Sequence, residues 1–214
     1  MKSFRMLHVA ALSAICLIAF AACNNNNKKT EQASTDSVNI KKDSTTSQDS
    51  NDSSIKMITV SFPKLDSKLA SSLTEIVNQY LKIKNALAND KGSDAADAGK
   101  VMAASMSKLD KSLLSAEQKK IYDFSEESLK EDAEHIGKNG DNIKHQREHF
   151  ANMSEEVYSL VKAFGGGREL YRVHCPMYNE DKSGAYWLSE TKEVSNPYFG
   201  AEMPTCGEVQ ELIK

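Results

Sequence analysis

The sequence lacks a long hydrophobic run, and this absence excludes a conventional transmembrane helix. The mostly apolar stretch from Leu7 to Ala22 has 16 residues, whereas a helix needs roughly 20 apolar residues to cross a bilayer. The stretch follows two basic residues and ends directly before Cys23. Residues 1–22 are therefore predicted to be an export signal, and the mature protein is expected in the cell envelope.

Aromatic residues are absent from the segment that follows the signal. Residues 24–56 contain seven Ser, four Thr and six Asn, and their five Lys are balanced by five acidic residues. Such a segment cannot bury enough apolar surface to offset the entropy that it would lose on folding. We therefore predict a disordered tether over 23–56. The rest of the chain is predicted to form one domain, with a helical bundle over 57–167 and a cap over 168–214 that packs on the bundle.

The predicted domain also lacks an excess of positive charge. Residues 57–214 hold 20 Lys and Arg against 25 Asp and Glu, which gives a net charge of −5. A nucleic-acid-binding domain needs a basic face that replaces the counterions of the phosphates. The charge balance therefore argues against nucleic acid, and against an anionic membrane surface, as a binding partner of the domain.

Motifs of the common catalytic sites are missing as well. The chain has no serine nucleophile elbow, no glycine-rich phosphate loop after a strand and no His-Glu-x-x-His helix. A histidine beside Cys175 could form a thiol dyad, but nothing in the sequence fixes such an arrangement. We do not predict an enzyme.

The residues around Cys23 indicate how the protein is anchored. Phe20-Ala-Ala-Cys23 resembles the lipobox of bacterial lipoproteins, in which small residues precede a cysteine that is lipidated before the signal is removed. Cys23 is therefore the predicted lipidation site, and the membrane is a predicted partner through that lipid. The alternative is an ordinary signal peptide that happens to end before a cysteine. Because Cys16 leaves with the signal, only Cys175 and Cys206 remain in the domain.

Apolar residues recur at helical spacing through most of the domain. The pattern predicts four helices of about 20 residues joined by short loops, which favours a mainly α fold, an up-down four-helix bundle. The expected helices run from Leu65 to Asp90, from Asp94 to Leu113, from Ser115 to Gly137 and from Ile143 to Phe164. After them we expect a small irregular C-terminal cap, in which 170–173 and 185–188 could pair as a short β-hairpin.

Histidines on the last two expected helices invite a metal interpretation. His145 and His149 are four residues apart, a spacing that can chelate a metal from one helix face. His149 falls at the edge of the apolar stripe that contains Ile143 and Phe150, whereas His145 falls further toward solvent. We therefore nominate His149 as a ligand, interpret His145 as part of a solvated face and assign no role to His135.

The expected cap contains two pairs of sulfur-bearing residues. Cys175 and Met177 flank Pro176, and in an extended strand their side chains would point to the same side. Met203 and Cys206 form the second pair. Two thiols and two thioethers favour Cu(I) or Ag(I), and the thiolates could also bind Zn(II). The alternative is a disulfide between Cys175 and Cys206, which the spacing alone favours slightly in an oxidising compartment.

Several segments in combination resemble a known family. They are Gln146–Phe150, Cys175–Met177, Gly184–Ser189, Asn196–Gly200, Met203 and Cys206-Gly207. Together they resemble a family of uncharacterised bacterial envelope proteins, a domain of unknown function, and the resemblance covers 57–214. The same domain is found in lipoproteins and fused to periplasmic adaptor subunits of heavy-metal efflux systems. His174-Cys-Pro-Met177 also resembles, in part, the His-Cys-Pro-Met-His-Pro metal-binding motif of copper export proteins.

The resemblance implies metal handling and moves the prediction toward a metal site. The predicted ligands of Cu(I), or of another soft metal ion, are His149, Cys175, Met177, Met203 and Cys206. The predicted function is that of an envelope lipoprotein that binds this ion, copper in the first place, and supports metal efflux or homeostasis. The partner that the resemblance implies is a heavy-metal efflux adaptor. The alternative function is a non-catalytic interaction module that a Cys175–Cys206 disulfide holds together.

Overall fold

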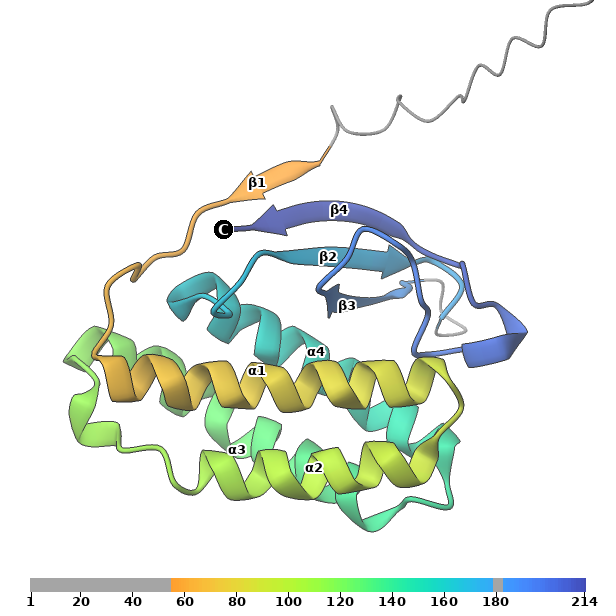
Figure 1. Cartoon of the computed structure of the whole chain (residues 1–214), viewed down its shortest axis with the longest axis horizontal. Coiled ribbons are helices and arrows are strands. Elements are labelled where there is room, and N and C mark those ends of the chain that lie inside the picture. The colour runs from red at the N-terminus through yellow and green to blue at the C-terminus, as the bar shows by residue number, and fades with distance from the viewer. Residues whose placement is uncertain (1–54, 179–182) are drawn as a thin grey trace, which may run out of the picture. The chain divides into compact units, whose positions relative to one another are not determined.

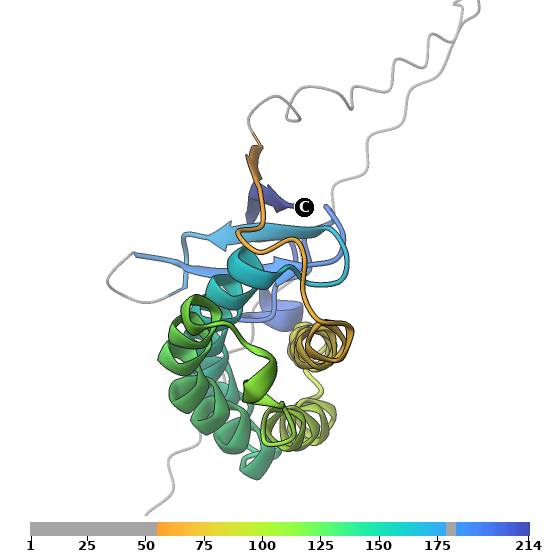
Figure 2. The ribbon, with the colours of Figure 1, turned by 90° about the vertical axis from the view of Figure 1, so that its left-hand side faces the viewer.

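Four helices form the larger part of the domain. The computed structural model describes residues 55–178 and 183–214 (Figure 1), so the predicted signal, Cys23 and nearly all of the tether lie outside the described residues. The helices are α1 Ser67–Ala88, α2 Gly92–Met106, α3 Ala116–Lys138 and α4 Ile143–Phe164. Each helix packs against the next one in the chain, and the end-on view shows all four around a common core (Figure 2). The predicted mainly α four-helix bundle is confirmed.

Local hydrogen bonds explain where α3 begins and why α2 is shorter than predicted. Ser115 and Gln118 form the predicted capping box at the start of α3. Helix α2 was expected to continue to Leu113 but ends at Met106. Beyond its end, the Asp110 side chain accepts a hydrogen bond from the backbone N–H of Ser112 and begins the short 3₁₀ helix η2 Lys111–Leu113. Such side-chain bonds compete with the helical pattern that the apolar spacing suggests.

A four-stranded sheet lies over α1 and α4 (Figure 1). Its strands are β1 Lys56–Ile58, β2 Leu170–Cys175, β3 Ala185–Ser189 and β4 Glu208–Ile213, in the spatial order β1-β4-β2-β3. The antiparallel β2–β3 pair confirms the expected hairpin. Strands β1 and β4, which pair in parallel, were not predicted. The cap is therefore less irregular than expected, and the expected domain boundary at residue 57 falls within β1.

The Tyr80 hydroxyl joins the bundle to the sheet. Tyr80 on α1 is fully buried, and its hydroxyl accepts a hydrogen bond of 2.9 Å from the backbone N–H of Leu188 in β3. The same oxygen lies 2.9 Å from the Ser154 Oγ on α4, which donates to the Phe150 carbonyl. Burial raises the pKa of Tyr80 well above its usual range, so the hydroxyl stays protonated. One buried group thus connects two helices and a strand.

Arg147 fixes the beginning of α4 against the loops at the same end of the bundle. Its guanidinium donates to the Leu87 carbonyl at 3.0 Å, to the Pro197 carbonyl at 2.9 Å and to the Asp90 carboxylate at 2.6 Å. The backbone N–H of Ala201 donates to the other oxygen of Asp90. The Ala201 N–H and the Arg147 guanidinium hold the pKa of the Asp90 carboxyl below its usual value. The first turns of α4 are therefore held by charged hydrogen bonds as well as by packing.

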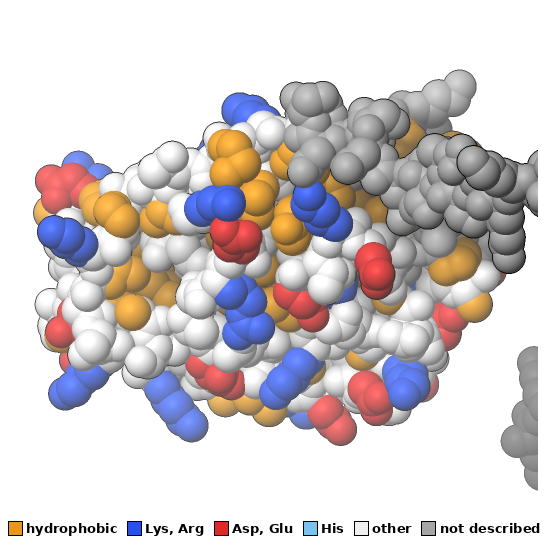
Figure 3. Space-filling model, turned by 45° about the horizontal axis from the view of Figure 1, so that its top comes forward, with side chains coloured by type: hydrophobic (Ala, Val, Ile, Leu, Met, Phe, Trp, Pro, Cys, Tyr) orange, Lys and Arg blue, Asp and Glu red, His pale blue; other side chains and the backbone are white. Residues whose placement is uncertain are grey.

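The exposed surface carries both signs of charge. Figure 3 shows basic and acidic side chains interspersed on one face, with apolar side chains between them. Within 55–178 and 183–214, no helix is long and apolar enough to cross a membrane.

Replacing Tyr80 with Phe tests the connection between bundle and sheet. The change leaves the buried N–H of Leu188 without its acceptor, so the free energy of unfolding should fall by about 1 to 3 kcal/mol. The control is Tyr122→Phe, because Tyr122 is also fully buried but its hydroxyl has no hydrogen-bond partner among the described residues. Urea denaturation of both variants measures the difference, and equal losses would contradict the assigned role of Tyr80.

Candidate metal site

Three histidines form a cluster where α3 ends and α4 begins. His135 lies in the last turn of α3, and His145 and His149 lie in the first turns of α4. One ring nitrogen from each histidine lies within 4.8 Å of a ring nitrogen of each of the others. The His135 ring stacks on the His149 ring with centroids 4.3 Å apart, and the His145 ring meets His149 edge-on at 4.6 Å. Three imidazoles therefore converge from two neighbouring helices.

Two asparagines shape the turn that brings the histidines together. The Asn139 side chain donates to the His135 carbonyl at 2.8 Å, which satisfies one of the free carbonyls at the end of α3. The Asn142 side chain accepts from the backbone N–H of His145 at 3.2 Å and caps α4. The backbones of two of the three histidines are thus held by the caps of their own helices.

The buried side-chain amide of Gln146 joins α4 to α2 and α3 beneath the histidine cluster. Gln146 is fully buried, and its Nε2 donates to the Ile136 carbonyl on α3 at 3.0 Å and to the Gly92 carbonyl on α2 at 2.9 Å. Helices α2 and α3 approach closely there, since a Cβ on Gly99 would lie 2.8 Å from the Ala133 carbonyl oxygen. The backbone beneath the cluster is therefore rigidly supported.

Asp132 supports the cluster from below. Its Oδ1 lies 2.7 Å from the Nδ1 of His149, and only 4% of the residue is exposed. If His149 donates from Nδ1, its Nε2 is left with a free lone pair. A carboxylate in this position is typical of metal-binding histidines, because it fixes the tautomer and orients the ring. Burial raises the pKa of the Asp132 carboxyl, while the hydrogen bond with His149 opposes that rise.

The outer side of the cluster faces solvent. The exposed fraction of the side chain is 42% for His135, 33% for His145 and 18% for His149. Two exposed carboxylates approach from this side: Glu131 lies 3.8 Å from the His135 ring and Glu148 lies 3.5 Å from the His145 ring. The arrangement can hold a cation near the surface, and imidazole nitrogens suit Zn(II), Cu(II) and Ni(II).

The cysteines of the expected sulfur site are bonded to each other. Cys175, at the end of β2, forms a disulfide with Cys206, and their Cα atoms are 5.6 Å apart. This was the alternative to the metal interpretation. A disulfide does not offer the thiolates that a soft-metal site requires, so the Cys175–Cys206 pair in this form does not fit Cu(I).

The other three nominated ligands, Met177, Met203 and His149, do not form one site with the cysteines. Met203 lies in the turn that leads to Cys206, whose backbone N–H donates to the Met203 carbonyl. Met177 is 62% exposed. His149 belongs to the histidine cluster, which contains neither cysteine. The structure therefore brings together Cys175 and Cys206 but groups His149 with two histidines that were not nominated.

Sequence reasoning missed His135 and set His145 aside. The expected positions of His149 at the stripe edge and His145 further out agree with their exposures. A usable signal was nevertheless present. Antiparallel helices joined by a short turn place residues at equal distances from the turn at the same level, which puts His135 beside the first turns of the next helix.

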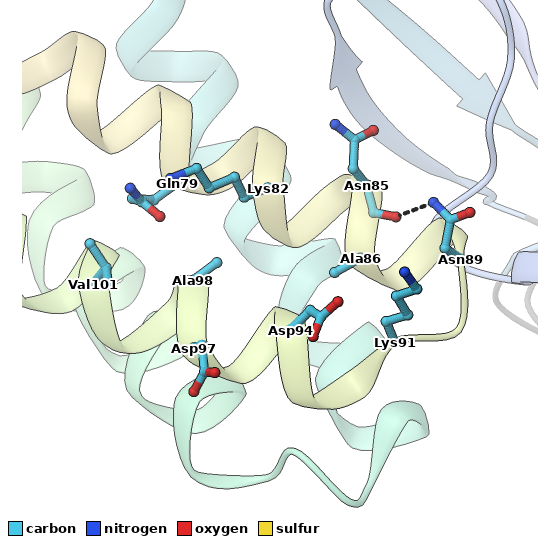
Figure 4. Close-up of a pocket in the computed structure, with 10 residues that line it drawn as sticks. All are labelled: Gln79, Lys82, Asn85, Ala86, Asn89, Lys91, Asp94, Asp97, Ala98 and Val101. Carbon is cyan, nitrogen blue, oxygen red and sulfur yellow. Dashed lines mark hydrogen bonds between the residues drawn. The ribbon is translucent and has the colours of Figure 1, made fainter.

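A groove elsewhere on the bundle carries no comparable chemistry. It lies between α1 and α2 and has a volume of about 560 Å³ (Figure 4). Its lining residues are Gln79, Lys82, Asn85, Ala86, Asn89, Lys91, Asp94, Asp97, Ala98 and Val101. They include neither histidine nor cysteine, and two lysines offset two aspartates. Asn89 donates to the Asn85 carbonyl at the end of α1 (Figure 4).

Comparison with known proteins identifies one similarity. A family model described as "Protein of unknown function (DUF3347)" matches residues 76–169. The match runs from within α1 to the residue before β2, so it includes the whole histidine cluster and Asp132 but neither Cys175 nor Cys206. The cap motifs that contributed to the resemblance over 57–214 lie outside it. No curated protein and no solved structure matches the chain.

Removing the disulfide tests its structural role. A double Cys175→Ala, Cys206→Ala variant should lose stability, because the bond closes a loop with a sequence separation of 31 residues. The chain-entropy relation gives about 3.7 kcal/mol for a loop of this size. Urea denaturation with and without reductant measures the loss. Free thiols in the unreduced exported protein, detected by alkylation and mass spectrometry, would contradict the bond.

Proposed function

We propose that this protein binds a transition-metal ion through His135, His145 and His149. The observation that carries the proposal is the convergence of three imidazoles within 4.8 Å, with a buried carboxylate bonded to the innermost ring. Three neutral imidazoles provide enough donors for a specific site on a helical scaffold. The function is metal binding, and catalysis is not part of the proposal.

The donor atoms favour a particular group of ions. Imidazole nitrogens suit Zn(II), Cu(II) and Ni(II), whereas Mg(II) and Ca(II) prefer oxygen ligands. Copper, which the sequence resemblance implied, therefore stays within the proposal, but as an ion held by nitrogen and not by sulfur. Bound metal would cross-link the facing ends of α3 and α4.

The proposed setting of this activity is the cell envelope. A lipid on Cys23 would hold the domain near a membrane, and the polar segment that follows would allow it to reach a neighbouring protein. An efflux adaptor that receives the ion is the partner that the resemblance implied. In this proposal the protein buffers the ion or delivers it for metal efflux or homeostasis.

A second candidate is a non-catalytic interaction module. The observation that favours it is the Cys175–Cys206 disulfide, which joins the end of β2 to the loop before β4. In that case the stapled sheet would be the binding surface and the histidines would be incidental. Failure of the metal-binding experiment below would favour this candidate.

Metal titration of purified protein tests the first proposal. Isothermal titration calorimetry with Zn(II), Cu(II) and Ni(II) should give one bound ion per chain. Replacing any one of the three histidines with Ala should weaken binding at least about tenfold, because a ligand is lost. His174→Ala is the control, since His174 packs against Tyr186 in the sheet and outside the cluster. Unchanged affinity in the cluster variants would refute the site.

Replacing Asp132 with Asn tests the role of the buried carboxylate. We expect metal affinity to fall by about 10- to 100-fold, which is typical when the partner of a ligating histidine is removed. The stability of the metal-free protein should not fall, because the second oxygen of Asp132 is buried without a hydrogen-bond partner among the described residues. Ser125→Ala is the control, because Ser125 is another buried polar residue on α3 with an unpartnered side chain. Denaturation and calorimetry of each variant separate the two effects, and loss of stability with unchanged affinity would indicate a purely structural aspartate.

A further inference from the structure

We infer that an ion held by the three histidines keeps one coordination position open to a monodentate donor from another molecule. The inference rests on the proposed function and concerns what the bound ion can do. Its basis is three converging ligands, the lack of a fourth His, Cys, Asp or Glu in range within the described part of the chain, and the exposure of one side of the cluster.

The first argument is the composition of the cluster. All three imidazoles come from two adjacent helices, α3 and α4. Among the described residues, no further His, Cys, Asp or Glu offers an atom within the same distance of all three. Zn(II) and similar ions usually take at least four ligands, and three protein ligands with one solvent position is the common pattern of an open site.

The nearby carboxylates do not complete the site. The Oδ1 of Asp132 is bonded to His149 at 2.7 Å and is buried beneath it. Glu131 and Glu148 each pair with a single ring, at 3.8 and 3.5 Å, and their side chains are 68% and 56% exposed. Neither is close enough to all three rings to belong to the cluster. They are nevertheless the nearest competitors for the open position, so they are removed in the experiment below.

The second argument is access. The side chains of His135 and His145 are 42% and 33% exposed, whereas His149 and Asp132 form the buried side. An ion between the rings would therefore have protein on one side and solvent on the other. Closed structural sites surround their ion with protein ligands instead.

The chemistry that such a position would supply is ligand exchange. A coordinated water would leave the ion and a lone pair of the incoming nitrogen or anionic donor would take its place, with no transfer of electrons. His135, His145 and His149 would hold the ion throughout. Such a position would let an imidazole or carboxylate of a second protein contact the ion before the histidines release it.

Cobalt substitution with added ligands tests the inference. The full domain is loaded with Co(II), and its visible absorption is recorded during titration with azide and then with imidazole. A saturable shift of the bands with one ligand per metal supports an open position. The His149→Ala variant, which lacks one of the three ligands, should not give the same response, and His174→Ala should respond as the unaltered protein does.

Two further measurements distinguish the remaining outcomes. If sedimentation shows a Co(II)-dependent dimer whose spectrum changes on dilution, a second copy of the chain supplies the donor, and the position is still open within one chain. If the unaltered protein gives no response but the Glu131→Gln, Glu148→Gln variant does, the fourth ligand is internal and the inference is overturned. If Co(II) binds and neither protein responds, the inference is also overturned, whereas failure to bind Co(II), Zn(II) and Cu(II) removes the proposed function itself.

Discussion

Helix α4 has to pack against two layers at once, and the rest of the molecule depends on this constraint. One side of α4 contributes Phe150, Met153 and Val157 to the buried core, and Ser154 lies beneath β3 through its contact with Tyr80. His145 and His149 lie between this buried side and the exposed side of α4 that carries Lys144 and Glu148, and there they meet the end of α3. The position of the histidine cluster thus follows from how α4 satisfies the bundle and the sheet together.

Two polar side chains, Asp132 and Gln146, are buried beneath the histidine cluster. Asp132 keeps one oxygen without a described partner, while Gln146 uses its Nε2 fully but leaves its Oε1 unpartnered in the part of the chain that is described. Buried polar groups that are only partly satisfied cost free energy. Proteins commonly accept such costs where a side chain serves binding. The two residues together form a rigid base of hydrogen-bonding groups beneath three more exposed rings.

The bundle could be predicted from the sequence because apolar residues recur at helical spacing wherever one side of a helix is buried. The Ser115–Gln118 capping box could be predicted because it depends only on residues close together in the chain. The sheet was only partly predictable. Strand β1 has three residues and gains its stability from β4, at the other end of the chain, so no local pattern could reveal it. The spacing of Cys175 and Cys206 was compatible with both a bond and a metal, because it does not encode the separation of the sulfurs in space. His135 was missed because it was considered only within its own helix, whereas its two histidine neighbours lie on the next helix.

The parallel pairing of β1 with β4 has a mechanical consequence. Lys56–Ile58 is the first element after the N-terminal segment, and it is held by its ladder to Glu211–Ile213, by the bond from the Lys214 N–H to the Ile58 carbonyl and by the Lys56–Glu211 ion pair. A pulling force transmitted along that segment would reach this short ladder before it reached any helix. If β1 detached, the load would pass to the segment before α1, where the Ser61 and Phe62 N–H groups donate to the Lys162 and Ala163 carbonyls at the end of α4.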